Sequence, residues 1–373
     1  MSAAYIIAAR RTAVAPREGA FRAVEVYDLA APVIRAALTD AGVAAAEVDD
    51  VILGNALYGG GNPARMAALA AGLPDGVPAL TVDTQCSSGL DAILLAAARI
   101  TAGEAGIVLA GGLESFSRAP LRFVRPRQAE EKPRAYARPP FSPFAERDPD
   151  LIESAASLAC RLGITREDQE RFAIGSHRKA RDAGPSAAIV EVEGLNHDAF
   201  ARKLDPRLCA RLPVLAGDAA HGVTAATVAV EADAAAIVVL ASEAVARRAS
   251  FALRVIGGAR RGGDTAQPAT VPVAAMKELL ERFGRRPEDL ASVEIMEAFA
   301  VQAMACASGI RLDPDTVNKW GGALGRGHPI GASGAILCVQ LYQQAKAAGD
   351  GGFLGLAAIA AAGGLGSALL LGD

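Results

Sequence analysis

Short apolar runs alternate with segments whose apolar residues recur at helical spacing over the first third of the chain. The run at 5–14 predicts a strand, and the spacing over 26–41 predicts a helix that ends at Gly42. The same reasoning predicts strands at 51–54, 79–82 and 106–110 and a helix from about residue 91 to 101. This alternation is typical of an α/β fold whose strands are buried by helices.

A second series of elements in the same order follows residue 250. It predicts a strand at 252–257, a helix at 273–283, a strand at 291–296, a helix that opens at residue 331, and a strand pair at 353–361 and 367–371. Gly363-Gly364 repeats the Gly111-Gly112 pair that ends the first series. Such an internal repeat predicts two similar halves that pack through central helices. Residues from both halves are then expected to meet in a site between them.

The pattern weakens between the two series. Residues 125–150 are rich in proline and charge and predict an exposed loop, and residues 151–184 predict helix with Thr165 as an N-cap. A strand at 235–240 returns to the first half. We expect an N-terminal half (1–117 with 235–250), an inserted loop domain (118–234) and a C-terminal half (251–373).

Length, charge and cysteine usage narrow the class of protein. The 373 residues exceed the roughly 250–300 at which one core stops growing. A formal net charge of −3 gives no global attraction to nucleic acid, and no stretch reaches the roughly 18 uncharged apolar residues of a membrane span. The five cysteines are widely spaced, without a CxxC pattern or a Cys/His cluster. We therefore expect a cytoplasmic protein without disulfides, bound metal, nucleic-acid partner or membrane segment.

Cys86 lies between the strand predicted at 79–82 and the helix that follows. The free N–H groups and positive dipole of a helix N-terminus are expected to favour its thiolate. Gly89, in the first turn, is expected to let a bulky acyl group approach the sulfur. A small buried thiol at the end of a strand explains the same position equally well. The local residues leave both interpretations open.

His328 lies in a glycine-dense loop, 321–334, that feeds the last predicted helix, and Pro329 fixes the backbone beside it. An imidazole titrates near neutrality and can accept a thiol proton or polarise an acyl oxygen. A hydrogen-bonded loop histidine without a catalytic role is the alternative. The other three histidines, His177, His197 and His221, lie in the insertion without a spacing that suggests ligation.

Five motifs, in this order along nearly the whole chain, resemble the thiolase family. They are Asn62-Pro63-Ala64-Arg65, Cys86-Ser87-Ser88-Gly89-Leu90, Gly112-Leu113-Glu114-Ser115, Glu297-Ala298-Phe299-Ala300 and Gly327-His328-Pro329-Ile330-Gly331-Ala332-Ser333-Gly334. The resemblance implies duplicated αβαβα halves that form a five-layered core, with an inserted loop domain. It also implies homodimers or homotetramers, acyl-coenzyme A as the donor, and no cofactor apart from this thioester substrate.

The resemblance also implies roles for individual residues. Cys86 becomes acylated, and His328 activates it and later helps to hold the enolate oxygen of a second substrate. The backbone N–H groups of Cys86 and Ala362 are expected to bind the thioester carbonyl as it becomes tetrahedral. Ala298 and Phe299, in the fourth motif, are expected to contact the substrate.

Two positions depart from the family pattern. Ala360 aligns with a second cysteine that removes the α-proton of the attacking thioester. Met296 replaces the asparagine that holds a water in the enolate oxyanion hole, and a thioether cannot donate a hydrogen bond. Losing an oxyanion-hole donor lowers the rate by about 10²–10³, and losing the base lowers it by about 10²–10⁴ more. We expect ordinary, non-decarboxylative Claisen condensation to be impaired.

A third departure lies at 224–233, where the family usually has a Gly/Asn/Ser-rich turn that touches the coenzyme. Val228, Val230 and Glu231 are poor substitutes for such a turn. The change indicates a different acyl chain or a carrier-protein thioester as the donor.

Three functional readings follow. In the first, the chain loads an acyl group on Cys86 and passes it to an acceptor that needs no base at Ala360. In the second, it keeps the thiolase reaction, with water or another residue as the base. In the third, it is a non-catalytic subunit with a thiolase fold, although such a subunit need not keep both Cys86 and His328.

Overall fold

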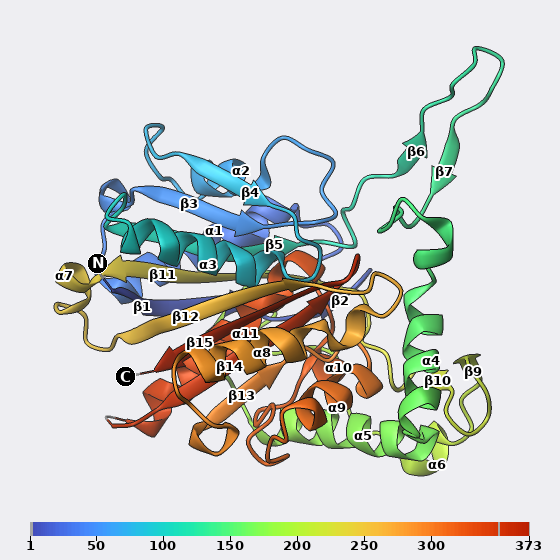
Figure 1. The fold of residues 1–373 in the computed structure, drawn as a ribbon. Coiled ribbons are helices and arrows are strands. Elements are labelled where there is room, and N and C mark those ends of the chain that lie inside the picture. Colours follow the sequence, from blue (N-terminus) through green and yellow to red (C-terminus); the bar gives the residue numbers. More distant parts are fainter. Residues whose placement is uncertain (1–2, 350, 373) are drawn as a thin grey trace.

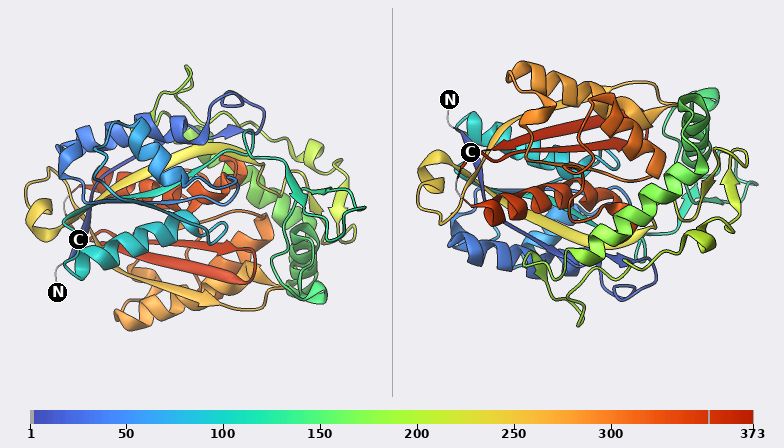
Figure 2. Two further views of the ribbon diagram at one scale, coloured as in Figure 1. Left: turned by 90° about the horizontal axis from the view of Figure 1, so that it is seen from above. Right: turned by 90° about the horizontal axis from the view of Figure 1, so that it is seen from below.

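The computed structural model describes residues 3–349 and 351–372, which form five stacked layers. Two layers of strands enclose two central helices, and further helices cover the outer face of each strand layer (Figure 1). In the left view of Figure 2, α1 (Val26–Ala41) lies above the strands of the N-terminal half, and α8 (Val271–Arg282) lies below those of the C-terminal half. The five-layered α/β core expected from the sequence is confirmed.

The N-terminal half contains most of the elements predicted for the first series. Its strands are β1 (Ala4–Thr12), β2 (Ala15–Pro16), β3 (Asp50–Gly54), β4 (Ala79–Val82), β5 (Ile107–Glu114), β8 (Ile189–Val190) and β11 (Ala232–Ser242). Its helices are α1, η1 (Ala45–Glu47), α2 (Pro63–Ala70), α3 (Ser88–Thr101) and α7 (Glu243–Ala246). The main strands run in the order β1-β11-β5-β3-β4, with β3 parallel to both β4 and β5. Helix α1 ends at Gly42, which adopts the left-handed conformation that the sequence predicts there.

The C-terminal half repeats this plan. Its strands are β12 (Leu253–Gly262), β13 (Ser292–Ile295), β14 (Leu354–Ala361) and β15 (Leu365–Gly372). Its helices are η3 (Pro268–Thr270), α8, η4 (Pro287–Asp289), α9 (Ala300–Gly309), α10 (Ala323–Arg326) and α11 (Ile330–Ala348). The strand order is β12-β15-β14-β13. Strand β12 also pairs with β1 through Leu253 and Ile6, so the strands of the two halves join at one edge.

The two central helices, α3 and α11, pack against each other with almost no space between their backbones. A Cβ atom at Gly89 would lie 2.7 Å from the carbonyl oxygen of Gly331, and one at Gly334 would lie 2.6 Å from the Leu90 nitrogen. Gly89 therefore permits contact between the helices. The expectation that it leaves room for an acyl group is wrong.

The region between the halves contains helices and short strands. Its elements are β6 (Arg122–Val124), β7 (Arg134–Tyr136), η2 (Ala145–Arg147), α4 (Leu151–Leu162), α5 (Arg166–Asp182), α6 (Pro206–Cys209), β9 (Val214–Ala216) and β10 (Val223–Thr224). Gly163, with φ of 66°, ends α4, and the Thr165 hydroxyl then caps α5 by accepting the N–H of Asp168. The cap at Thr165 is confirmed, but the predicted helical stretch is broken just before it.

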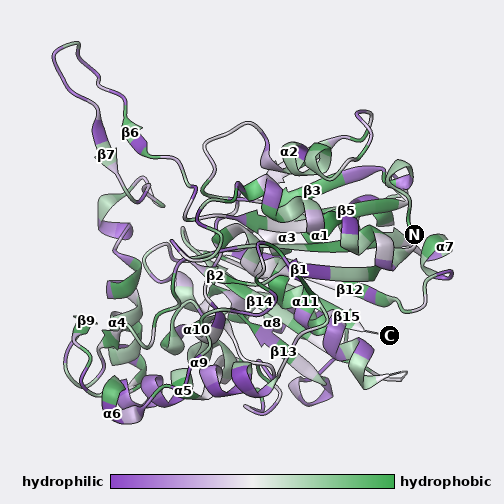
Figure 3. Ribbon diagram, turned by 180° about the vertical axis from the view of Figure 1, so that it is seen from behind, coloured by the Kyte–Doolittle hydropathy of each residue, from purple (hydrophilic) through white to green (hydrophobic). Residues whose placement is uncertain are grey.

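The stretch predicted to be an exposed loop projects from the body of the molecule as the β6–β7 hairpin (Figure 1). Figure 3 shows strands such as β3 and β5 largely hydrophobic, with hydrophilic stretches along α5 and the hairpin. Among the described residues, no helix is both long enough and apolar enough to cross a membrane.

Candidate active site

Cys86 lies in a tight turn between β4 and α3. Gln85 before it has a positive φ of 56°, and the Ser88 hydroxyl donates to the Gln85 carbonyl at 2.5 Å while accepting the N–H of Thr84 at 2.9 Å. These bonds fix the turn that presents the cysteine to the space between the halves. The Cys86 side chain stays partly exposed and packs against the core that surrounds the central helices.

His328 lies between α10 and α11, at the start of the second central helix. Its backbone N–H donates to the carbonyl of Val230 at 2.7 Å, which anchors the loop to the segment before β11. Gly327 precedes it with φ of 115°, a conformation that favours glycine. The backbone conformation at position 327 therefore favours glycine over other residues.

The hydrogen bonds of Ser333 define the tautomer of His328. The Ser333 hydroxyl donates its single proton to the Pro329 carbonyl at 2.9 Å, and its oxygen lies 2.7 Å from His328 Nδ1. Ser333 must then accept a proton from Nδ1. This assignment leaves the lone pair of Nε2 free, and Nε2 lies 3.2 Å from Cys86 Sγ. A nitrogen of this kind beside a thiol can accept the thiol proton.

Both partners are neutral in the resting site. Burial raises the pKa of the Cys86 thiol to about 12, and burial lowers the pKa of the His328 imidazole to about 4. The expectation that the helix N-terminus favours a free thiolate is therefore wrong, because the loss of hydration exceeds the effect of the nearby N–H groups. Sulfur and imidazole form an uncharged donor–acceptor pair.

Two backbone N–H groups reach the sulfur. They belong to Cys86 itself and to Ala362, and both act against the burial effect by lowering the thiol pKa. Ala362 follows the end of β14, where Gly363 and Gly364 turn the chain with φ of 80° and 74°. Ala360 precedes Ala362 by two residues, so its Cα lies within about 7 Å of that of Ala362.

Met296, Ala298 and Phe299 follow the end of β13. Met296 is buried, with 2% of its surface exposed, in the same apolar core against which Cys86 and Ala298 pack. The Ala298 carbonyl accepts the N–H of Ala229 at 3.0 Å, and Phe299 pairs with Val228. The altered segment 224–233 therefore runs directly beside the fourth motif.

The same altered segment also borders the histidine loop. Glu231 forms a parallel bridge with His328, and its carboxylate accepts a hydrogen bond from Arg17 at 2.8 Å. The residues at 224–233 that differ from the family pattern therefore lie next to His328. They also lie next to Ala298 and Phe299, which the family resemblance predicts to contact the substrate.

Glu114 supports the site in a way that the sequence did not reveal, although it lies in one of the motifs. Its buried carboxylate accepts the backbone N–H groups of Ala56, Leu57 and Gly331 and the side chain of Asn55. Burial raises its pKa to about 7. With four donors already bound, this carboxylate holds the start of α11 in place and has little capacity left to act as a base.

Glu297 holds the glycine-dense loop in place through hydrogen bonds. Its carboxylate accepts the Ser176 hydroxyl, the Asn318 amide and the N–H of Leu324. A Cβ at Gly322 would lie within 2.1 Å of this carboxylate, so glycine is required there.

Four other cysteine and histidine side chains lie apart from the Cys86–His328 pair. Cys306 on α9 and Cys338 on α11 are buried, and burial raises the pKa of both thiols. His177 is buried on α5, where burial lowers its pKa to about 4, and His197 lies in an exposed loop. All five cysteines are free.

Comparison with known proteins covers the whole chain. The thiolase N-terminal domain matches residues 4–244, and the thiolase C-terminal domain matches residues 250–373. The Bacillus subtilis (strain 168) protein YhfS, named provisionally as an acetyl-CoA C-acetyltransferase, is 38% identical over 98% of both chains. The Staphylococcus aureus (strain MRSA252) protein VraB, named in the same way, is 35% identical over 96% of this chain and 99% of its own.

Two solved structures superpose closely. The Bacillus anthracis acetyl-CoA acetyltransferase has a TM-score of 0.91 and 32% identity, covering 100% of this chain and 99% of its own. The Acat5 thiolase from Ascaris suum, solved in complex with coenzyme A, has a TM-score of 0.90 and 31% identity over 100% of both chains. The family matches do not separate an inserted domain at 118–234, which stays a prediction. With both family domains present and the fold shared throughout, the chain belongs to the thiolase family of acyltransferases.

Proposed function

We propose that this chain takes an acyl group from acyl-coenzyme A or a carrier-protein thioester onto Cys86 and passes it to an acceptor. The observation that carries the proposal is the free lone pair of His328 Nε2, 3.2 Å from Cys86 Sγ. A thiol beside a positioned base is the arrangement that nucleophilic catalysis requires.

In the loading step, His328 Nε2 takes the proton of the Cys86 thiol as the sulfur attacks the thioester carbonyl carbon. A carbon–sulfur bond forms at Cys86, and the bond to the departing thiolate then breaks. The departing thiolate recovers the proton from the imidazolium and leaves as a free thiol. Because both groups are neutral at rest, charge separates only while the carbonyl is being attacked.

The negative charge that develops on the carbonyl oxygen needs donors fixed in advance. The N–H groups of Cys86 and Ala362 already face the sulfur, so they lie within reach of an acyl oxygen bonded next to it. The turn at Gly363-Gly364 and the start of α3 hold these two groups on opposite halves of the molecule.

The acceptor is one that needs no base at the position of Ala360. A methyl group cannot accept a proton, and the thioether of Met296 is only a weak acceptor. Suitable acceptors are an amine, an alcohol, an activated aromatic carbon, or a β-keto acid or malonyl-type thioester that generates its carbanion by decarboxylation. The coenzyme A complex of the Ascaris suum thiolase supports coenzyme A as the carrier, whereas Val228 and Val230 beside Phe299 support a changed donor site.

A second candidate is the thiolase reaction itself, with a bound water or another group as the base. The names of the Bacillus and Staphylococcus relatives favour it. A non-catalytic subunit is the third candidate, and the intact Cys86–His328 pair disfavours it.

We also propose that the chain forms a homodimer or a homotetramer. Strand β4 lies at the edge of the strand order and carries the exposed Leu80, and the β6–β7 hairpin exposes Leu121 and Phe123. Exposed apolar residues on an edge strand and on a projecting hairpin are suited to contacts with further copies. A cytoplasmic location is proposed as well, and the five free cysteines support it.

The release of free coenzyme A from acetyl-coenzyme A, with and without a panel of acceptors, tests the function. We expect turnover to need an amine, alcohol or decarboxylating acceptor and to vanish in Cys86→Ala. Cleavage of acetoacetyl-coenzyme A that is lost in Cys86→Ala would replace the first candidate by the second. Activity of a co-purified partner that is unchanged by Cys86→Ala would favour the third.

A further inference from the structure

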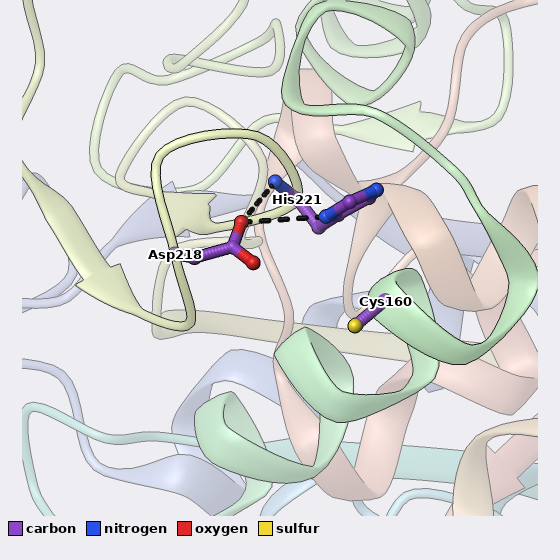
Figure 4. Close-up of side chains that lie close together, drawn as sticks. All are labelled: Cys160, Asp218 and His221. Carbon is purple, nitrogen blue, oxygen red and sulfur yellow. Dashed lines mark hydrogen bonds and ion pairs between the residues drawn. The ribbon is translucent and has the colours of Figure 1, made fainter.

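Three metal-ligating side chains from two separate segments converge far from Cys86 in the sequence. Cys160 lies in the last turns of α4, and Asp218 and His221 lie in the loop between β9 and β10 (Figure 4). One donor atom from each, a sulfur, a carboxylate oxygen and a ring nitrogen, lies within 4.8 Å of the other two. Within residues 3–349 and 351–372, no other group of three such residues meets this spacing.

The loop holds two of the three donors rigidly. Asp218 Oδ1 accepts the backbone N–H groups of Ala220 and His221 at 2.9 and 2.8 Å. The loop is also tied to α5, because the His221 carbonyl accepts the Gln169 side chain and the Ala220 carbonyl accepts the N–H of Arg166. Asp218 and His221 therefore keep their relative positions without any ligand, which lowers the entropic cost of binding one.

The Asp218 and His221 donors face each other (Figure 4). His221 Nδ1 lies 3.3 Å from Asp218 Oδ1, yet this nitrogen is shielded from solvent and has no hydrogen-bond partner. A divalent cation bound between Nδ1 and Oδ1 would satisfy both atoms.

The spacing fits a particular geometry. Two ligands of a tetrahedral zinc ion, each bound at about 2.0–2.1 Å, are separated by about 3.3–3.4 Å. The distance of 3.3 Å between Nδ1 and Oδ1 agrees with this edge of the tetrahedron. The third ligand would be a sulfur. Zinc sites in proteins combine thiolate sulfur, imidazole nitrogen and carboxylate oxygen, which are the three donors present here.

Cys160 can supply that sulfur. It is the exposed member of the five cysteines, and its side chain projects from α4 toward the loop (Figure 4). Rotation of an exposed side chain can close the remaining gap of about 1 Å to a sulfur–oxygen or sulfur–nitrogen tetrahedral edge. A thiolate, a carboxylate and a neutral imidazole then balance the charge of a divalent ion, and the exposed side leaves a position for water.

We propose that Cys160, Asp218 and His221 form a Zn²⁺ site with water as the fourth ligand. No sequence pattern indicates this site, because Cys160 and the loop lie far apart along the chain and their meeting depends on how α4 and the β9–β10 segment pack. The site links α4 to that loop. Because α4 also packs on α9 through Leu158 and Val301, zinc stabilises the layer that covers the fourth motif.

A cobalt titration of the full-length, chelator-treated protein tests the site directly. Co²⁺ bound by a thiolate gives a near-ultraviolet charge-transfer band, and tetrahedral Co²⁺ gives strong visible bands. We expect both to saturate at about one equivalent per chain and to disappear when Zn²⁺ is added. We also expect the melting temperature to rise with Zn²⁺.

Variants separate ligation from folding. Cys160→Ser and His221→Ala should each lose the charge-transfer band or weaken Co²⁺ binding at least tenfold, whereas His197→Ala, which removes an exposed histidine elsewhere, should bind normally. Asp218→Asn keeps the oxygen that holds the loop but removes its charge, so weakened binding in a variant with an unchanged circular dichroism spectrum supports ligation. A missing band in the parent protein, or a band that survives in Cys160→Ser, would overturn the proposal.

Discussion

His328 Nε2 and Cys86 Sγ lie 3.2 Å apart although 242 residues separate them in the chain. Each precedes one of the two central helices, and those helices approach so closely that Gly89 and Gly331 nearly touch. The site is thus a direct consequence of how the two halves pack. A bulkier residue at Gly89 would separate the base from the thiol.

Ser333 determines which nitrogen of His328 carries the proton, so Ser333→Ala should slow acyl loading. Without the acceptor for Nδ1–H, the tautomer with a free Nε2 is no longer favoured. We expect roughly a tenfold lower rate of coenzyme A release in a single turnover, since one such hydrogen bond contributes about 1–1.5 kcal/mol.

The matched control for this variant is Ser87→Ala. Ser87 is also buried and lies next to Cys86, but its hydroxyl has no hydrogen-bond partner. Its loss should leave the rate within about twofold. Equal rates for the two variants would show that Ser333 does not orient the imidazole.

The rate of acyl loading should be nearly independent of pH around neutrality. His328 is a base only when unprotonated, so the rate should fall as the pH drops toward about 4, the lowered pKa of the imidazole. The thiol ionises by itself only near pH 12. Pre-steady-state coenzyme A release across this range checks the profile. A tenfold rise per pH unit between about pH 6 and 8 would mean that a free thiolate reacts instead.

Glu114→Gln should destabilise the fold around the site. The carboxylate accepts four donors, and an amide would turn an NH₂ group toward some of them. We expect the free energy of unfolding to fall by about 1–3 kcal/mol, measured by chemical denaturation. Glu130→Gln, at an exposed position in the β6–β7 turn, should change it little. If Glu114→Gln is as stable as the parent, the Glu114 carboxylate does not hold the start of α11 in place.

The double variant Met296→Asn with Ala360→Cys should gain cleavage of acetoacetyl-coenzyme A. Each change restores one group that the family resemblance places beside the enolate. Because the base and the oxyanion donor each contribute about 10²–10⁴ in rate, the double variant should exceed either single variant by at least about tenfold. If the parent already cleaves as fast, another group must serve as the base.

Local elements of this fold could be predicted well from the sequence. The apolar spacing of 26–41 with Gly42 gives the bounds of α1, and Thr165 marks the start of α5, because both signals depend on neighbouring residues alone. Ordered motifs led to the family and to Cys86 and His328.

Features that depend on packing could not be predicted in this way. The bridge between Ile6 and Leu253 joins strands from different halves, and nothing in either strand specifies the other as its partner. The pKa of Cys86 depends on how completely the halves exclude water, which a helix-dipole argument does not include. Ser333, Glu114 and the Cys160 cluster act through contacts that form only after the chain has folded.

Intact mass spectrometry after incubation with acyl-coenzyme A tests the central claim most directly. We predict one covalent acyl adduct per chain, mapped by peptide analysis to Cys86, absent in Cys86→Ala and formed about 10²–10⁴ times more slowly in His328→Ala. An adduct that persists in Cys86→Ala, or one that forms as fast without His328, would contradict it.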